Sequence, residues 1–384
     1  MYQPIELTIT IPAVRTSFSR SPSCRRVLFV TVPAAALVAL TVVLGPVAHA
    51  GTTPTPTPTP TSFNLRKIPL QSNAWGAVNV NQALNKIYTS GNPCSNSDIE
   101  VVVIDGKTFT STPVGYGQEV SVDNKSNRYW AATIFGNGTY PPGVIVRDGK
   151  TNTVITPVAL NDYCPIATAY DFFKNRMWVG AQCGGDNDPV FAIDANTFQV
   201  IAGPIGSGHV MGSIIANGAN GRLYLQVTEP TAQYSERVDP KTFAVTQNAF
   251  GQVVAINAIT NRLYAVSGNN LQIINGAPDP EVILATIPLG YAPGGMGINT
   301  GFNHLYIANP AGNSVEVRNA STGALITTFS LGLGVTPNGA MAVDSIRGRI
   351  YVIQNPSSCS TPAPVLLVIE DLINAFKPDC ILSH

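Results

Sequence analysis

The residues best suited to metal binding or proton exchange are one histidine and two carboxylates. Each of them precedes a predicted strand. His209 lies in GSGHVMG, Glu119 in GQEV and Asp162 in ALNDYC. An imidazole and carboxylates gathered at one place can bind a metal ion or exchange protons with a ligand. The alternative is that they are ordinary polar loop residues that never meet. The elements that carry them decide between the two.

Other motifs that carry chemistry are weak. Asp186 and Asp188 could offer oxygen ligands to calcium, but two carboxylates are few for such a site, and a solvated loop is the alternative. The sequence contains no HExxH, GxSxG or CxxCH motif and no GxxxxGKS/T phosphate loop. His304 occupies the basic position of a repeated turn and is expected at the surface. We therefore predict no cofactor, with a divalent metal as the open alternative.

A repeated pattern organises the chain after residue 63. It consists of Asn or Asp, three residues, Asn or Gly, usually a basic residue, and an apolar run with an aromatic residue. The aromatic residues recur at intervals of 40 to 48, a period typical of propellers and solenoids. The seven copies begin at Asn81, Asp123, Asp171, Asn217, Asn257, Asn299 and Asp344, and their aromatic residues are Tyr88, Trp130, Trp178, Tyr224, Tyr264, Tyr306 and Tyr351.

Each repeat has the turn chemistry of two hairpins. The leading Asn or Asp can bond to the backbone two residues on, and the trailing Asn or Gly tolerates the left-handed conformation that closes a hairpin. A second turn, Asp-x-x-Thr, follows about 17 residues later, with Asn275 and Glu370 as departures. Four strands per repeat predict an all-β, seven-bladed β-propeller of four-stranded antiparallel blades.

The ends of the repeat region predict how the ring closes. The seventh unit shows three strands, whereas the segment 64–70 (NLRKIPL) resembles the fourth strands 283–290 and 325–332. We expect this N-terminal strand to complete the last blade, which would remove the open sheet edges. The propeller is predicted to occupy residues 64–384.

The repeat resembles that of exported YVTN-type β-propellers, which are related to NHL-like and lactonase propellers. The resemblance covers residues 64–370 and lies in turn and core positions. It implies an extracytoplasmic binding scaffold whose ligand site surrounds the mouth of the central channel. Segments that lead into first strands lie at that mouth in such propellers, so the resemblance makes Glu119, Asp162 and His209 the ligand-binding candidates.

The first residues predict export. Four arginines up to Arg26 precede an uncharged run, 27–48, which ends in the small-x-small sequence Ala48-His49-Ala50. This pattern is typical of a signal peptide over residues 1–50, with an uncleaved membrane anchor as the alternative. Residues 51–63 form a Pro/Thr-rich linker expected to adopt extended polyproline II structure, or a glycosylated stalk.

Charge bears on the partners. Lys and Arg number 22, as do Asp and Glu, and removal of residues 1–50 leaves 18 against 21, a net charge of minus three. A nucleic-acid partner is therefore not expected. We expect a monomer in the secreted, periplasmic or cell-surface space, in contact with a membrane only through an uncleaved anchor.

Five cysteines follow the signal segment, as suits an oxidising compartment. If Ala169 pairs with Trp178, the same register places Cys164 opposite Cys183, which predicts a disulfide between them. Cys94 and Cys359 occupy equivalent loops of the first and last repeats, where a bridge would join the seam of the ring. Cys380 could compete for Cys359.

Two functions remain open. The first is an exported, non-catalytic scaffold that binds a protein, glycan or peptide through its loop face. The second is an enzyme of the lactonase or lyase type with its site at the channel mouth. The sequence leaves the catalytic residues undetermined.

Overall fold

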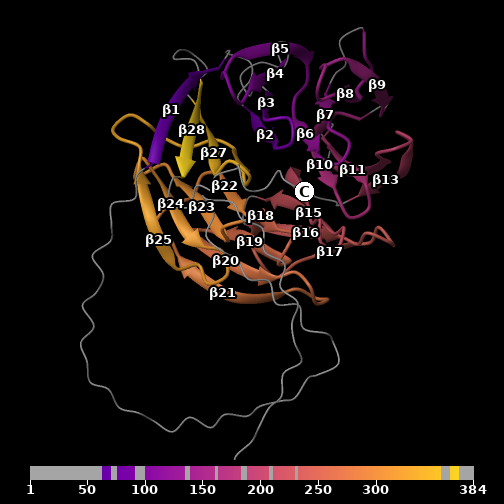
Figure 1. Ribbon diagram of the computed structural model, residues 1–384. Coiled ribbons are helices and arrows are strands. Elements are labelled where there is room, and N and C mark those ends of the chain that lie inside the picture. The colour runs from indigo at the N-terminus through magenta and orange to yellow at the C-terminus, as the bar shows by residue number, and fades with distance from the viewer. Residues whose placement is uncertain are drawn as a thin grey trace, which may run out of the picture. The chain divides into compact units, whose positions relative to one another are not determined.

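The computed structural model describes residues 63–70, 76–90, 100–134, 139–160, 163–182, 188–206, 211–229, 232–355 and 364–371. In these ranges 28 strands form seven four-stranded antiparallel sheets, without helices, so none of the described elements is a helix able to span a membrane. The sheets are arranged in a ring (Figure 1). The prediction of an all-β, seven-bladed propeller is confirmed. The predicted signal segment, and the linker up to residue 62, lie outside the described residues.

The first four blades follow one another along the chain. Blade 1 contains β2 (Ala77–Asn81), β3 (Lys86–Ser90), β4 (Glu100–Asp105) and β5 (Ser111–Tyr116). Blade 2 contains β6 (Val120–Asp123), β7 (Arg128–Thr133), β8 (Gly143–Asp148) and β9 (Val154–Ala159). Blade 3 contains β10 (Pro165–Asp171), β11 (Arg176–Ala181), β12 (Pro189–Asp194) and β13 (Val200–Gly206). Blade 4 contains β14 (Met211–Ala216), β15 (Leu223–Thr228), β16 (Gln233–Val238) and β17 (Val245–Gln247).

The remaining blades complete the ring. Blade 5 contains β18 (Gln252–Asn257), β19 (Arg262–Ser267), β20 (Asn270–Asn275) and β21 (Val282–Pro288). Blade 6 contains β22 (Met296–Asn299), β23 (His304–Asn309), β24 (Ser314–Asn319) and β25 (Leu325–Ser330). Blade 7 contains β26 (Met341–Asp344), β27 (Arg349–Gln354), β28 (Val365–Asp371) and, from the other end of the chain, β1 (Phe63–Pro69).

The closure of blade 7 confirms the predicted role of the N-terminal strand. β1 pairs antiparallel with β28 from Phe63 opposite Asp371 to Pro69 opposite Val365. In Figure 1 the indigo strand β1 lies beside the yellow strand β28. The Phe63 ring also packs on Phe329 of blade 6, with 4.8 Å between ring centroids. The last sheet therefore has four strands like the others, although its strands come from opposite ends of the domain.

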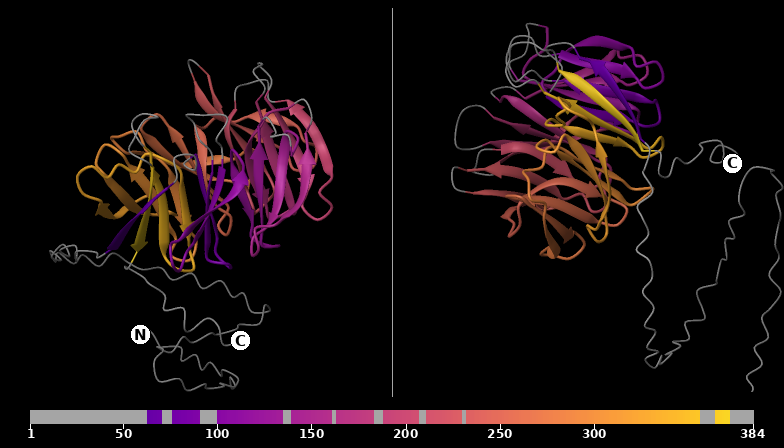
Figure 2. Two further views of the ribbon diagram at one scale, coloured as in Figure 1. Left: turned by 90° about the horizontal axis from the view of Figure 1, so that it is seen from above. Right: turned by 90° about the vertical axis from the view of Figure 1, so that its left-hand side faces the viewer.

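The first strands of the blades lie around the central axis, where each contacts the first strands of its neighbours. Because the strands alternate in direction, the turns between strands one and two, and between strands three and four, lie at one end of every sheet. We call this the lower end. The connections between strands two and three, and from one blade to the next, lie at the opposite end, the upper end. Figure 2 shows the ring from two further sides.

The turns at the lower end have the predicted chemistry. In the turn of blade 3, the Asp171 Oδ1 accepts hydrogen bonds from the backbone N–H groups of Phe173 (3.0 Å) and Lys174 (3.1 Å). The trailing residue Asn175 has a φ of 52°, in the left-handed region that Asn and Gly tolerate. The trailing residue has a positive φ in all seven turns, at Asn85, Asn127, Asn175, Gly221, Asn261, Asn303 and Gly348.

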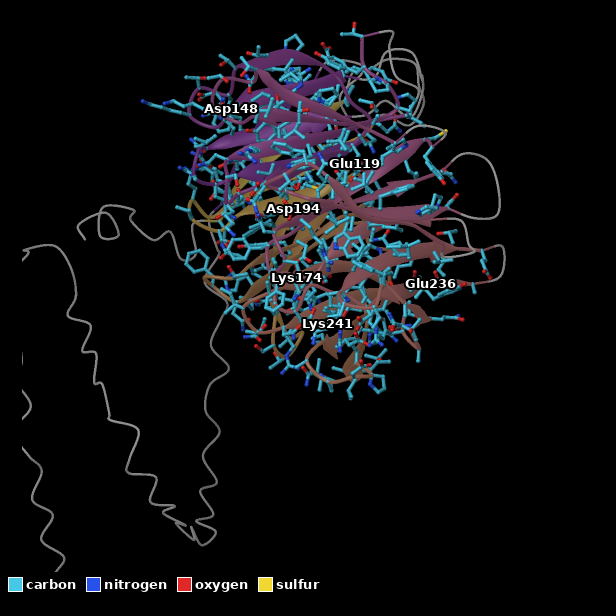
Figure 3. All side chains as sticks on the ribbon, turned by 90° about the vertical axis from the view of Figure 1, so that its right-hand side faces the viewer. Glu119, Asp148, Lys174, Asp194, Glu236 and Lys241 are labelled. Atoms are coloured by element: carbon cyan, nitrogen blue, oxygen red, sulfur yellow. The ribbon has the colours of Figure 1, made fainter. Side chains whose placement is uncertain are left out.

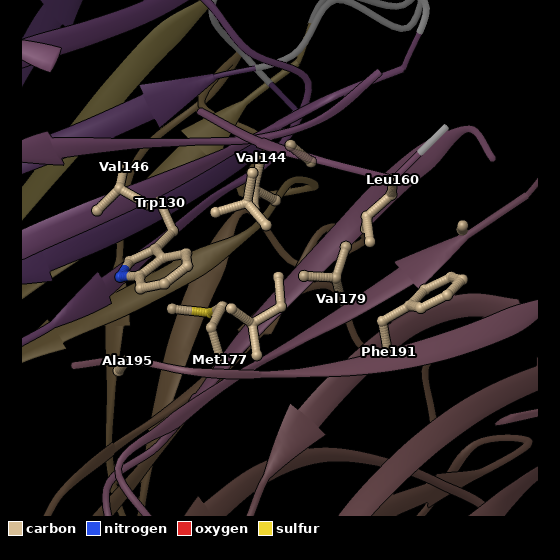
Figure 4. Packing of buried hydrophobic residues seen from close by; sticks show 12 residues of the cluster. Trp130, Val144, Val146, Leu160, Met177, Val179, Phe191 and Ala195 are labelled. Carbon is tan, nitrogen blue, oxygen red and sulfur yellow. The ribbon is translucent and has the colours of Figure 1, made fainter. Parts of the chain in front are cut away.

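The core lies between the blades. The seven aromatic residues of the repeat are all fully buried. Figure 4 shows the packing between blades 2 and 3, where Trp130 and Val146 face Met177 and Ala195. Because each aromatic residue fills the space against a neighbouring blade, the repeat period of the sequence is the period of interblade packing.

Candidate functional site

In five of the repeated turns the basic residue joins neighbouring blades. The Arg176 Nη1 donates to the carbonyl of Pro240 (3.1 Å) in blade 4, and its Nε donates to the Asp171 Oδ2 (3.0 Å). Its guanidinium also lies 4.3 Å from the ring centre of Trp178. Burial raises the pKa of the Asp171 carboxyl, and its N–H partners and the ion pair with Arg176 oppose that rise. Arg176 therefore has a structural role. We call such a bond, from a turn residue of one blade to a carbonyl of the next blade, a clasp.

The same clasp recurs around the ring. The acceptor is a backbone carbonyl in the next blade. It lies one residue after the Asp or Asn that opens the turn between strands three and four, which we call the outer turn. The donors and acceptors are Lys86 and Gly149, Arg128 and Ala195, Arg176 and Pro240, Arg222 and Gly276, and, across the seam, Arg349 and Gly106. Between blades 5 and 6, the Tyr264 hydroxyl donates to Ala320 instead (2.9 Å).

Three phenylalanines reinforce these clasps. Phe109, Phe198 and Phe243 each have a φ of 60°, a conformation unusual for a bulky residue. The Phe198 ring lies 5.7 Å from that of Trp130, and the Phe243 ring lies 6.0 Å from that of Trp178. The left-handed turn thus places each ring in the interface with the preceding blade.

The expectation that His304 is a surface turn residue is wrong. It is only 7% exposed. Its Nδ1 lies 3.5 Å from the Oδ2 of Asp371 at the end of β28, and the Tyr306 hydroxyl donates to the same oxygen (2.7 Å). The third strand of blade 7, β28, brings this carboxylate to the position that a backbone carbonyl occupies in other interfaces. His304 therefore belongs to the clasp between blades 6 and 7.

Glu119 is the candidate channel residue that the structure describes. It directly precedes β6, the first strand of blade 2, at the upper end of the channel, and its backbone carbonyl accepts from the Ala132 N–H (2.8 Å). The side chain keeps some exposed surface, but the surrounding protein strips water from the carboxyl and raises its pKa to about 8. Such a carboxyl carries a proton near neutral pH and can donate or accept one.

Of the other candidates, three lie outside the described residues and one lies within them. Asp162, His209 and Asp186 lie outside the described residues, so their meeting with Glu119 stays a prediction. Asp188 is fully buried directly before β12. Among the described residues, no group of three or more His, Cys, Asp or Glu side chains is placed to hold a metal ion.

Of the cysteines named in the disulfide predictions, Cys164 is the one that the structure describes. The pairing of Ala169 with Trp178 is confirmed, but a bulge between Pro165 and Ala167 shifts the register by one residue. The Cys164 carbonyl consequently accepts from the Gln182 N–H (2.8 Å). Cys164 is not a free thiol. Its predicted bridge stays a prediction because its predicted partner Cys183 lies outside the described residues, as do Cys94, Cys359 and Cys380.

Polar side chains also cap the inner edges of the channel strands. The Asn79 Nδ2 donates to the carbonyl of Val120 (2.7 Å), and the Ser121 Oγ donates to that of Thr168 (2.8 Å). Each bond runs from one blade to the first strand of the next. These groups satisfy edge carbonyls that would otherwise need water, so they hold the channel wall together.

Basic residues separate the two ends of the ring, whereas carboxylates occur at both. In the sequence, the 14 segments that connect strands at the upper end contain no Lys or Arg. Figure 3 shows Lys174, Asp148 and Asp194 toward one end and Glu119 toward the other. The carboxylates of the upper segments are Asp98, Glu119, Asp162, Asp186, Asp188 and Glu229, and the basic residues of the lower segments are Lys107, Lys125, Lys150, Lys174, Arg222, Lys241 and Arg347. Sequence reasoning missed this separation because it becomes visible only after every segment is assigned to an end.

Comparisons with known proteins support the fold. No family model and no curated protein matches this chain. The solved structures similar to it include the β-propeller domain of Myceliophteria thermophila Cps50 (Swd1), with a TM-score of 0.59 at 11% sequence identity, over 80% of this chain and 99% of that one. The fold thus defines the chain as a seven-bladed β-propeller, and its resemblance to YVTN-type repeats stays a prediction.

Proposed function

We propose that this chain is an exported binding scaffold whose upper end takes an extracytoplasmic protein, peptide or glycan. The observation that carries the proposal is the division of labour between the two ends. The repeated polar residues are used in clasps at the lower end, whereas the segments of the upper end differ in length and sequence from blade to blade. Such variation on a rigid scaffold is typical of binding surfaces.

The charge of the upper end bears on the ligand class. Segments that contain no Lys or Arg, and that carry carboxylates such as Asp98, Asp162 and Glu229 in the sequence, favour basic groups over polyanions. This supports a basic or neutral partner and disfavours a nucleic acid. The signal segment predicted in residues 1–50 supports an encounter outside the cytoplasm.

Site-specific photocrosslinking tests the proposal. One photoreactive amino acid replaces Leu333, which is 97% exposed in the upper segment between β25 and β26, and a matched variant carries it at Ile259, 76% exposed in a lower turn. In producing cells, we expect protein, peptide or glycan adducts at position 333 and not at position 259. The absence of such adducts at position 333, or their presence only at position 259, would contradict it.

Glu119 supports a second candidate function, an enzyme of the lactonase or lyase type. A carboxyl with a pKa near 8 suits general acid or base catalysis close to neutral pH. If a metal completes that site, the purified chain holds a stoichiometric divalent metal that is lost when Glu119 and His209 are both changed. Metal analysis of the wild type and the Glu119→Gln/His209→Gln variant tests this function, and a metal-free wild type would count against it.

A further inference from the structure

The tips of the seven turns between strands one and two carry an unusual set of residues. Three positions lie between the leading and trailing residues of each turn, and none of them in any blade is Asp or Glu. Phe172 is 58% exposed and Phe173 is 54% exposed in blade 3. Ile259 of blade 5 and Ile346 of blade 7 are also exposed, and the basic residues of these tips are Lys125, Lys174 and Arg347.

The apolar tips of neighbouring blades adjoin one another. A Cβ at Gly218 in blade 4 would lie 3.6 Å from the Cβ of Phe172 and 3.5 Å from the Cβ of Ala258. A Cβ at Gly348 in blade 7 would lie 3.8 Å from the ring of Phe302 in blade 6. The tips thus form two apolar stretches on the lower end, over blades 3 to 5 and over blades 6 and 7. Exposed apolar patches of this kind mark interaction surfaces.

The tips are held rigidly. The leading Asn or Asp accepts backbone N–H groups within each tip, as Asn257 does from Ile259 (3.1 Å) and Thr260 (3.2 Å). The clasps fix the same turns to the next blade. The exposed side chains therefore project from fixed positions around the channel exit, and they project outward. The tips carry Lys125 and Lys174 and no carboxylate, whereas the turns between strands three and four of the same end also carry carboxylates, such as Asp105 and Asp279. Projecting apolar side chains with basic residues among them suit a deformable, anionic surface.

The course of the chain identifies that surface. β1 begins at Phe63, opposite Asp371, and so at the lower end. The segment that precedes it, with the uncharged run 27–48 that is long enough to cross a bilayer, joins the propeller at the same end as the apolar tips. In a propeller attached to a membrane through this run, the chain would enter the ring at its lower end.

We propose that the lower end is a membrane-facing surface. Phe172, Phe173, Ile259 and Ile346 enter the interface of an anionic bilayer, and the surrounding lysines contact its headgroups. This orientation leaves the upper end free for a ligand, but it does not depend on the function proposed for that end. The proposed contacts themselves lie within the ring, so they can be measured on a form without residues 1–50.

Vesicle flotation tests the proposal on residues 51–384, the form that cleavage after Ala50 produces. This form retains all 28 strands, the closed ring and every described contact, and its thermal melting is measured first. The probes are vesicles of phosphatidylcholine alone and vesicles that also contain phosphatidylglycerol. The variants are Phe172→Ser/Phe173→Ser and Lys125→Glu/Lys174→Glu, and the matched control is Leu333→Ser at the upper end. Thermal melting confirms that each variant is folded.

We expect the wild type and Leu333→Ser to float with the phosphatidylglycerol vesicles. Each lower-end variant should bind these vesicles at least about tenfold more weakly. For the lysine variant, one basic group near an anionic surface changes binding about fivefold and each reversal changes it by more. The phenylalanine variant removes two apolar side chains whose burial in the interface would contribute to binding. Equal binding to both kinds of vesicle, or unchanged binding by the lower-end variants, would overturn the proposal. So would binding to a poly-glutamate peptide but to neither vesicle, which would assign the surface to an acidic protein. None of these results affects crosslinking at position 333.

Discussion

The two ends of the ring are built from different kinds of residue. At the lower end, the same turn, basic and aromatic positions recur from blade to blade, and five of the basic residues bond to the next blade. At the upper end, the segments share no motif and contain no Lys or Arg. The sequence repeat therefore corresponds to residues that stabilise the ring at its lower end. The residues outside the repeat are the ones available for a function specific to this protein.

The comparison also shows how one repeat can serve two purposes at the lower end. The leading and trailing residues of each turn are buried or conformationally fixed, whereas the tip residues between them are free to vary. Phe172 and Lys174 are tip residues, and Asp171 and Asn175 hold them in place. A membrane-facing surface can therefore be changed without loss of the clasp.

The largest expected effect is the loss of a lower-end clasp. Arg176→Leu leaves the buried Asp171 carboxylate without its cation and should lower the free energy of unfolding by about 3–5 kcal/mol. Urea unfolding at neutral pH measures the change. The double variant Arg176→Leu/Asp171→Asn should recover part of the loss, because no charge then remains buried. A single variant as stable as the wild type would show that the clasp is dispensable.

At the upper end, the free energy of unfolding should depend on pH through Glu119. Folding raises the Glu119 pKa from 4.5 to about 8, so the native state binds more protons than the unfolded state between those values. Stability should therefore fall as pH rises through this window and change little above it. Glu119→Gln should remove that fall and be more stable than the wild type at pH 9 by roughly 2 kcal/mol, a figure reduced for partial exposure from the full value of about 1.36 kcal/mol per pKa unit.

Melting temperatures of the wild type and Glu119→Gln from pH 5 to pH 9 check this prediction. The two proteins should be similar in stability at the acidic end and should diverge as the pH rises. Parallel curves over the whole range would show that water reaches the Glu119 carboxyl freely.

At the lower end, the turn between strands three and four of blade 2 should contribute less to stability. Its contribution should be lost as the pH falls, whereas the stability that depends on Glu119 is lost as the pH rises. The Asp148 Oδ1 accepts from the Thr151 N–H (2.7 Å) and the Lys150 N–H (2.8 Å), and these bonds lower the carboxyl's pKa below 3.8. Its contribution is therefore present above pH 3.8 and is lost as acid protonates it. Asp148→Ala should cost about 1 kcal/mol at pH 7 and less at pH 3.

Asp148→Asn is the matched control, since Asn319 makes the same turn in blade 6. It keeps the accepting oxygen and should lose less stability than Asp148→Ala. Urea unfolding of the three proteins at pH 7 and pH 3 measures both effects. An alanine variant whose loss grows in acid would contradict the assigned role.

The smallest effect is expected at an exposed position of the upper end. Leu333 lies outside the sheets and is almost wholly exposed, so Leu333→Ser should change stability by less than about 0.5 kcal/mol. A melting curve checks it. A larger loss would show that this segment contributes to the ring, and the two ends would then differ less than proposed.

The blade number, the four strands and the closing strand could be predicted because they depend on local signals. Asx turns, left-handed Asn or Gly residues and alternating apolar residues act within a few positions of one another. The burial of His304 could not be predicted, because its partner Asp371 comes from another blade and lies 67 residues away in sequence. The bulge that shifts Cys164 is likewise invisible in the alternation of apolar residues.

The candidate site was predictable only as far as the position of Glu119 at the start of a first strand. Its raised pKa arises from protein packed around it in three dimensions, which no local pattern reports. The clasps show the same limit from another side. The basic residue of each turn was recognised as part of a repeat, but its acceptor in the next blade follows only from the closed ring.

Native-state amide hydrogen exchange tests the central claim most directly, because it reports the stability of each strand separately. If the ring is closed by β1 and held at its lower end, the amides of β1 that bond to β28 should exchange only through global unfolding, together with those of β11 and β19. Exchange of the β1 amides by local opening, while the strands of blades 3 and 5 remain protected, would mean that the ring does not depend on this closure.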